Sequence, residues 1–256
     1  MSRAARIAIA FSPFLAGAVA VIFVPLFEQD QVYHRFADAR SWLGIPNFGD
    51  VLSNAGFVIA GALGLALVPR AVLLEARERA IFAVHFAAQI LTGLGSAWYH
   101  WAPDDARMIW DRLPLTAAIL SFLAAVVADR VSVAAGWRLL APLLVTGAAS
   151  MAWWRATGDL RPYIVVQFAP MISIPLLVAL LPGRRLRGGD FIAVLGWYAL
   201  AKVCEVLDRP IFAALGGSVS GHTLKHLFAG VGAAWIVWMV ARAGRETDAA
   251  PSTRST

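Results

Sequence analysis

Apolar residues form eight long runs along this chain, separated by short polar stretches. The runs cover residues 6–27, 50–69, 80–99, 112–129, 138–154, 162–182, 190–207 and 221–241. Crossing a bilayer takes about 20 helical residues, so each run approaches or reaches that length. Because lipid offers no partner for free backbone polar groups, a spanning segment must be a helix or part of a closed barrel. Barrel strands alternate apolar and polar residues, whereas these runs are continuous. We therefore predict an all-α, polytopic membrane helix bundle.

The bundle is expected to form one transmembrane domain over residues 1–256. The apolar core of segment 6–27 is too long for a signal peptide, so we expect this helix to be retained. The polar tail 242–256 is predicted to be disordered. The sequence shows no internal repeat and no separate soluble domain.

Composition and charge agree with a membrane protein. Hydrophobic residues make up 59% of the chain and charged residues only 15%, whereas a soluble domain has about a quarter of its residues charged. The net charge of +6 comes from basic residues scattered through short loops, without a dense patch. We therefore predict no nucleic-acid partner and assign these charges to membrane orientation. A single cysteine, Cys204, excludes an intrachain disulfide and a cysteine-based metal site.

Arginine positions predict the orientation. On a path of eight helices, thirteen arginines fall on the side that holds both termini and seven on the other side. The side richer in Lys and Arg normally faces the cytoplasm. We expect both termini in the cytoplasm, in a bacterial inner membrane given the short loops, and the opposite ends of the helices at the outer (periplasmic) face.

Chemistry-bearing residues from distant segments are expected near that outer face. Ser96 and His100 are four residues apart at the end of one run, and His222 and His226 are four apart at the start of another. Such pairs share one helix face. Asp111 opens the next run at the same level. Other polar residues expected at this end are Asp50, Ser53, Asn54, Tyr198, Lys202, Glu205 and Arg209.

These residue types together indicate a metal-hydrolase site. A histidine pair at i and i+4 offers two imidazoles to one cation, and ionisable groups inside membranes are costly enough that their default interpretation is functional. Three imidazoles and a water of lowered pKa are the pattern of a catalytic zinc. We therefore predict His100, His222 and His226 as metal ligands. Asp111 is the predicted acid/base, and Ser96 the group that stabilises an oxyanion or positions the substrate.

Four motifs carry a resemblance to the alkaline ceramidases, within the superfamily that includes the progestin and adiponectin receptors. They are DVLSN at 50–54, GSAWYH at 95–100, WDRLP at 110–114 and HTLKH at 222–226. The resemblance implies a seven-helix core over about 48–241, with the first segment as an extra helix. It also implies a zinc-dependent amidase that splits ceramide into a sphingoid base and a fatty acid. The same three histidines are the implied ligands, with Asp111 and Ser96 in the catalytic roles.

The sequence departs from this family at two places. Asn47 stands where the family has an acid, and Glu28, Asp30 and Asp38 do not align with its calcium-binding stretch, so calcium is doubtful. Lys225 stands where the family has a tryptophan. The hydrolase mechanism therefore follows more directly from the motifs than ceramide does as the substrate.

Other functions fit parts of the pattern. One is a non-enzymatic receptor or lipid-binding protein with structural zinc. The others are a transporter or proton relay through Lys202, Glu205 and Asp208, a haem protein, an intramembrane serine protease using Ser96, and a purely structural hydrogen-bond network. His34 and His85 are left outside the predicted site. For the hydrolase, a membrane lipid that enters laterally is the expected partner, and the sequence does not identify a protein partner. Activity should fall below about pH 6.5, because ligand imidazoles must be neutral.

Overall fold

The structure, a computed structural model, describes residues 1–245. Over these residues the chain is helical, apart from loops and one isolated bridge between Trp42 and Ile45. The long helices are α1 (Arg3–Phe23), α4 (Ala76–Trp101), α5 (Asp105–Arg130), α6 (Val133–Thr157), α7 (Arg161–Leu180), α8 (Gly188–Val206) and α10 (Gly221–Arg245). The shorter ones are η1 (Gln31–His34), α2 (Phe48–Leu52), α3 (Ala55–Leu67), η2 (Val68–Arg70) and α9 (Asp208–Ala214).

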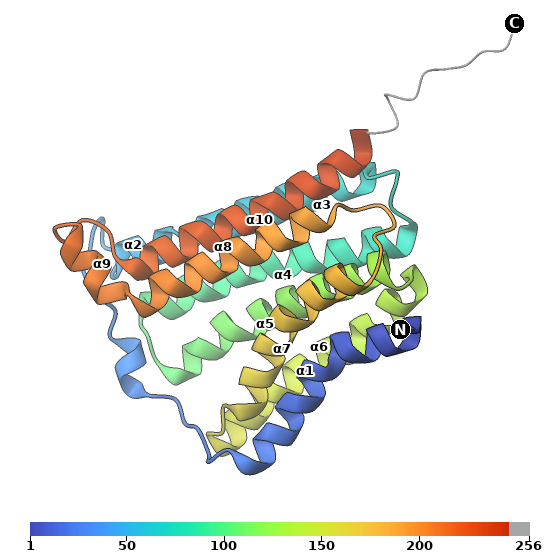
Figure 1. Cartoon of the computed structure of the whole chain (residues 1–256). Coiled ribbons are helices and arrows are strands. Elements are labelled where there is room, and N and C mark those ends of the chain that lie inside the picture. Colours follow the sequence, from blue (N-terminus) through green and yellow to red (C-terminus); the bar gives the residue numbers. More distant parts are fainter. Residues whose placement is uncertain (246–256) are drawn as a thin grey trace, which may run out of the picture.

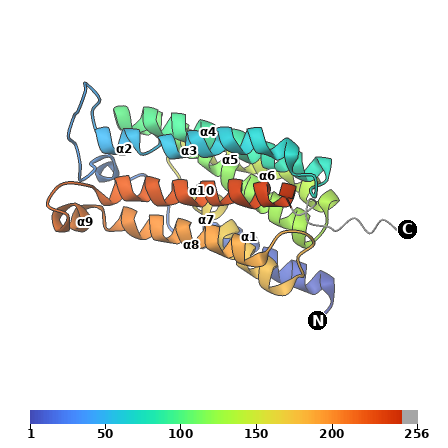
Figure 2. The same ribbon diagram turned by 90° about the horizontal axis from the view of Figure 1, so that it is seen from above.

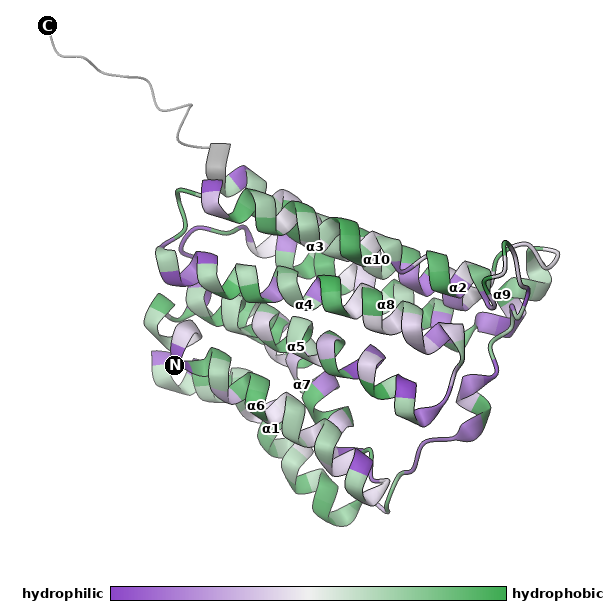
Figure 3. Ribbon diagram, turned by 180° about the vertical axis from the view of Figure 1, so that it is seen from behind, coloured by the Kyte–Doolittle hydropathy of each residue, from purple (hydrophilic) through white to green (hydrophobic). Residues whose placement is uncertain are grey.

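Seven stretches within the described residues are long and apolar enough to span a membrane. They are α1, the Phe48–Arg70 stretch from α2 to η2, α4, α5, α6, α7 and the Gly221–Ala243 part of α10. Apolar residues dominate these helices, whereas hydrophilic residues concentrate toward the ends of the bundle and in the loops (Figure 3). The prediction of an all-α polytopic bundle is confirmed at this level. The division into a seven-helix core and an extra helix stays a prediction.

Helix α8 is not among the seven apolar spans. Its 19 residues include the charged Asp190, Lys202 and Glu205, which interrupt its apolar stretch. It nevertheless lies beside α10 in both views (Figures 1 and 2). The N-terminus and the C-terminal end of α10 lie at the same end of the bundle, and α2 and α9 lie at the other (Figure 1). This arrangement fits an even number of passes, while the orientation in the membrane stays a prediction.

Helix caps explain why several helices extend beyond their apolar runs. Helix α4 begins with a capping box in which Glu75 and Glu78 satisfy each other's backbone N–H groups. Helix α5 begins at Asp105, seven residues before its apolar run, because the Asp104 carboxylate accepts from the backbone N–H of Arg107 at 2.7 Å. At its C-terminal end, α10 continues past its apolar run to Arg245. The predicted disordered tail therefore begins inside this helix, and its remaining residues, 246–256, lie outside the described part.

Two breaks in the helices lie at the end of the bundle where the polar residues collect. The second apolar run divides into α2 and α3 at Ser53 and Asn54, whose side chains bond across to α10. Helix α8, in the seventh run, ends at Val206, and the short helix α9, which the sequence pattern did not predict, follows it.

Close packing of α4 against α5 fixes the register between their polar residues. A Cβ atom on Gly95 would lie 1.9 Å from the carbonyl oxygen of Trp110. Only glycine permits this approach of the two backbones. As a result Ser96 and Asp111, the residues that follow these two, lie at the same level of the bundle.

Candidate metal centre

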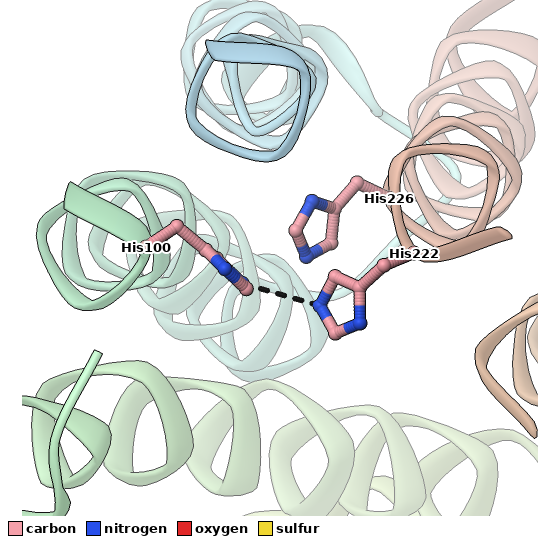
Figure 4. Close-up of side chains that lie close together, drawn as sticks. All are labelled: His100, His222 and His226. Carbon is pink, nitrogen blue, oxygen red and sulfur yellow. Dashed lines mark hydrogen bonds between the residues drawn. The ribbon is translucent and has the colours of Figure 1, made fainter. Parts of the chain in front are cut away.

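Three histidines from two helices meet at one end of the bundle. His100 lies in the last turn of α4, and His222 and His226 lie in the first turns of α10. Their ring centroids are 4.7 to 4.9 Å apart, and one nitrogen of each lies within 4.8 Å of the others. Each side chain is buried, with at most 3% of its residue surface exposed. Figure 4 shows the three rings converging on one point.

One pair of nitrogen atoms in this cluster already has the spacing found in a metal site. The Nε2 atoms of His100 and His222 are 3.3 Å apart. Two imidazoles on one tetrahedral zinc, with Zn–N bonds of about 2.0 Å, hold their nitrogens about 3.3 Å apart. Within the described residues, Nε2 of His226 and Nδ1 of His100 are buried without a hydrogen-bond partner. Because buried polar atoms are rarely left unpaired, an ion that takes up the free Nε2 fits this donor set. The cluster can therefore hold a metal ion.

Residues of the α2–α3 break orient His226. The Ser53 hydroxyl lies 2.9 Å from Nδ1 of His226 and donates to the Asp50 carbonyl oxygen at 3.2 Å. Ser53 therefore accepts from Nδ1–H, which leaves the lone pair of His226 on Nε2, the atom that faces the cluster. Such partners fix the tautomer and the ring orientation of metal-binding histidines.

Two acids, the buried Asp50 and the partly buried Asp208, anchor the start of α10. The Asp50 carboxylate accepts from the hydroxyls of Thr223, at 2.7 Å, and Ser220, at 3.1 Å. Asp208 accepts from the backbone N–H groups of His222 and Ala37, both at 2.8 Å. The histidine-bearing turns of α10 are thus held by α2, by α9 and by the loop before α2.

The loop between α1 and α2 covers the cluster. The Phe36 ring packs on His100 and His222, with centroids 4.5 and 4.4 Å apart. In the same loop, Asp38 is held by the guanidinium of Arg40 through bonds of 2.6 and 2.7 Å, which lowers the pKa of Asp38. Asp30 caps η1 by accepting from the backbone N–H of Val32. These loop acids therefore have structural partners.

A network of charges borders the histidines on the α8 side. Lys225 Nζ lies 3.0 Å from a Glu205 carboxylate oxygen and 3.1 Å from Nε2 of His222. Lys202 pairs with the same carboxylate, and the Tyr33 hydroxyl donates to it at 2.7 Å. The contact between Lys225 and His222 was not predicted, although their spacing of three residues places them on neighbouring parts of one helix face. Arg209 lies apart from the network, on α9, and donates to the carbonyl oxygen of Arg35.

A cavity of about 520 Å³ lies beside the cluster. Ser96, Asp111 and His226 all contribute to its wall. The wall is built by α3, α4, α5, α7, α8, α10 and the segment 27–33. The structure therefore brings the two predicted catalytic side chains to one space with a predicted ligand, and their roles stay predictions. Phe168 on α7 also lines the cavity while 39% of its surface is exposed, so the wall reaches the side of the bundle.

The two histidines left out of the predicted site lie apart from the cluster. His34 bonds the Tyr99 hydroxyl at 2.9 Å and the Asp105 carboxylate at 3.0 Å. His85 lies deeper along α4, where its Nδ1 is 2.9 Å from the carbonyl oxygen of Ala118. Each has a structural partner.

No protein-family model matches the chain, and no curated protein matches it. What the structure does show is a polytopic helical membrane protein with a buried cluster of three histidines that can hold a metal ion.

Proposed function

We propose that this protein is a zinc-dependent integral-membrane hydrolase that cleaves an amide bond in a ceramide-like lipid. One observation carries the proposal. Three buried imidazoles have one nitrogen each within 4.8 Å of the others, and one of them, His226, lines a cavity together with the carboxylate of Asp111 and the hydroxyl of Ser96. This is the set of groups that the resemblance to alkaline ceramidases implies.

His100, His222 and His226 would hold the zinc, which leaves a fourth coordination position for water. When bound, the metal supplies a water of lowered pKa and polarises a carbonyl group. Ser53 keeps His226 in the tautomer that can bind metal. The Phe36 ring covers His100 and His222 and shields that side of the cluster from water.

Asp111 transfers the proton, and Ser96 positions the carbonyl group of the substrate. Asp111 is partly buried in the cavity wall, where a carboxylate takes a proton from the attacking water and returns it to the leaving amine. Ser96, one helical turn before His100, donates its hydroxyl hydrogen to the carbonyl oxygen as negative charge develops there. The contact of Gly95 with Trp110 holds the two residues at one level.

The cavity suits a lipid substrate. Its wall includes Phe57, Leu115 and Phe168 as well as the polar residues. Because Phe168 is also exposed on the side of α7, an acyl chain has a lateral path from the bilayer. The amide group then reaches Asp111 and Ser96 without leaving the membrane.

The proposal is tested by measuring zinc and hydrolysis on the same purified protein. We expect about one zinc per chain, lost in His226→Ala and kept in the matched loop variant His34→Ala. Asp111→Asn should keep its zinc and lose hydrolysis across a panel of lipid amides. Wild-type protein that binds no zinc in metal-replete preparations contradicts the proposal.

A non-enzymatic receptor or lipid-binding protein with structural zinc is the second candidate. It is favoured by the closure of the cluster, because Phe36 covers two of the rings and Lys225 lies 3.1 Å from Nε2 of His222. Structural zinc sites are closed, whereas catalytic sites keep a position open. Stoichiometric zinc without turnover of any lipid amide or ester would select this candidate.

A further inference from the structure

Arg112 is a buried cation with an unused donor. Only 8% of its surface is exposed, and within the described residues its Nη1 atom has no hydrogen-bond partner. No carboxylate of the described residues forms an ion pair with it. Leaving a charge buried and unpaired is expensive, and ionisable groups inside membrane bundles are functional by default. Arg112 also lines the cavity that contains Asp111 and Ser96.

Aromatic rings hold the Arg112 guanidinium in place. Its Cζ atom lies 5.0 Å from the ring centroid of Tyr163, 5.1 Å from that of Trp154 and 5.6 Å from that of Tyr33. Nη2 donates to the neutral side-chain oxygen of Gln29 at 2.7 Å. Ring faces stabilise the cation, but they do not replace an acceptor in the guanidinium plane. The Nη1 side of the guanidinium is therefore fixed in direction and lacks a hydrogen-bond partner among the described residues.

The charges in the buried part of the cavity wall favour an anion. Its partly or fully buried wall contains three cations, Arg112, Lys202 and Lys225, and two acids, Asp111 and Glu205. Glu205 is already engaged by both lysines. The remaining lining acids, Glu28 and Asp30, are exposed at the loop. A buried excess of one positive charge thus remains, and the low dielectric of the bundle strengthens its attraction for an anion.

We propose that Arg112 binds an anionic oxygen group, a carboxylate or a phosphate ester, on a lipid held in this cavity. The planar fork of arginine matches both groups and binds them through paired N–H donors. Because Asp111 and Arg112 line the same cavity, the anionic group lies near the bond to be cleaved. That this lipid is a substrate rests on the proposed hydrolase function, whereas its binding at Arg112 does not.

The test measures binding of matched neutral and anionic lipids to the full chain in nanodiscs of zwitterionic phospholipid. One pair is a pyrene-labelled fatty acid and the corresponding alcohol, which probes carboxylate binding at mildly alkaline pH. The other is a labelled lysophosphatidic acid and the corresponding monoacylglycerol, which probes phosphate binding. In at least one pair, we expect the wild-type protein to bind the anionic member about tenfold more tightly or better, because charge-assisted hydrogen bonds are the stronger class.

Three variants separate anion recognition from a structural role. Arg112→Gln should lose most of the preference. Gln29→Glu should lose it too, because a carboxylate at that position pairs with Arg112 from within, and this change leaves Arg112 in place. The control Arg107→Gln should keep the preference, since Arg107 pairs with Asp104 and does not line the cavity.

The outcomes distinguish this inference from the proposed function. Equal binding of both members of each pair by the wild type, or an unchanged preference in both Arg112→Gln and Gln29→Glu, overturns anion recognition. Zinc content and hydrolysis of a neutral lipid amide are measured on the same samples. An anion preference in a protein without zinc or turnover would uphold the role of Arg112 while removing the hydrolase.

Discussion

At the scale of single residues, the partner of each ring nitrogen decides which histidine atom is free for a metal. His226 shows this most clearly, because Ser53 occupies its Nδ1 and leaves Nε2 unpaired in the cluster. Sequence spacing places two histidines on one face of a helix, but it does not show which nitrogen faces inward. A serine 173 positions away in the chain makes that selection.

Ser53→Ala is expected to weaken metal binding by about 10- to 100-fold, the usual cost of losing such an outer partner. The fold should persist, because Ser53 lies between α2 and α3 and its replacement interrupts neither helix. Competition with a zinc chelator measures the affinity. Ser150→Ala is the control, since that buried serine bonds the Gly147 carbonyl oxygen on α6, away from the cluster. Equal chelator sensitivity of Ser53→Ala and wild type would show that Ser53 does not support the site.

At the scale of elements, small residues set how closely the helices approach. Gly95 lets α4 touch the backbone of α5 at Trp110. The apolar runs predicted both helices, yet their lengths and their relative register depend on the cap at Asp104 and on this contact. Neither feature belongs to the hydrophobic pattern.

Gly95→Ala should destabilise the bundle, because the added methyl group would lie 1.9 Å from the Trp110 carbonyl oxygen and force α4 and α5 apart. Overpacking of this kind costs about 1–3 kcal/mol. Gly196→Ala is the matched control within a long helix, because nothing lies within 4 Å of its added Cβ. That change should be neutral or stabilising by up to about 1 kcal/mol. Thermal unfolding in detergent compares the two, and equal melting temperatures would contradict a tight contact at Gly95.

At the scale of the whole molecule, ion pairs and hydrogen bonds at the ends of the helices connect parts of the bundle. Arg161 donates to both carboxylate oxygens of Asp159 at 2.9 Å and also to backbone oxygens of Val21 and Val24. These bonds of Arg161 connect the end of α1 to the turn between α6 and α7. Figure 1 shows these helices on one side of the bundle, opposite α3 and α10.

The ion pair between Arg161 and Asp159 predicts that part of the free energy of unfolding is lost in acid. Arg161 lowers the pKa of Asp159 to about 2. A group whose pKa is depressed by folding stabilises the folded state above its unfolded pKa, about 3.9 for Asp, and loses that contribution as pH falls through the folded pKa. The stability difference between wild type and Asp159→Asn should therefore be constant near neutral pH and shrink between about pH 4 and pH 2. Unfolding in detergent across this range measures it, and a difference that grows on acidification would contradict the ion pair.

Much of the architecture was predictable, and so was the meeting of His100, His222 and His226. Continuous apolar runs and the cost of unpaired backbone in lipid lead to a helical bundle. The spacings of four residues placed Ser96 with His100 and His222 with His226 on shared faces. Two features were not predictable: the contact of Lys225 with His222 and the unpaired Nη1 atom of Arg112. Both depend on which side chains from other helices are left to pair with them.

The sequence by itself determined that this chain forms membrane-spanning helices and which of their faces are polar, because hydrophobic length and helical periodicity are local properties. Only the tertiary structure decided that one end of α4 meets the start of α10 with three imidazole nitrogens within 4.8 Å. It also decided that Asp111, Ser96 and Arg112 share a cavity with His226. Such meetings depend on how helices far apart in the chain pack and on the exact partners left for each polar atom, which no local pattern records.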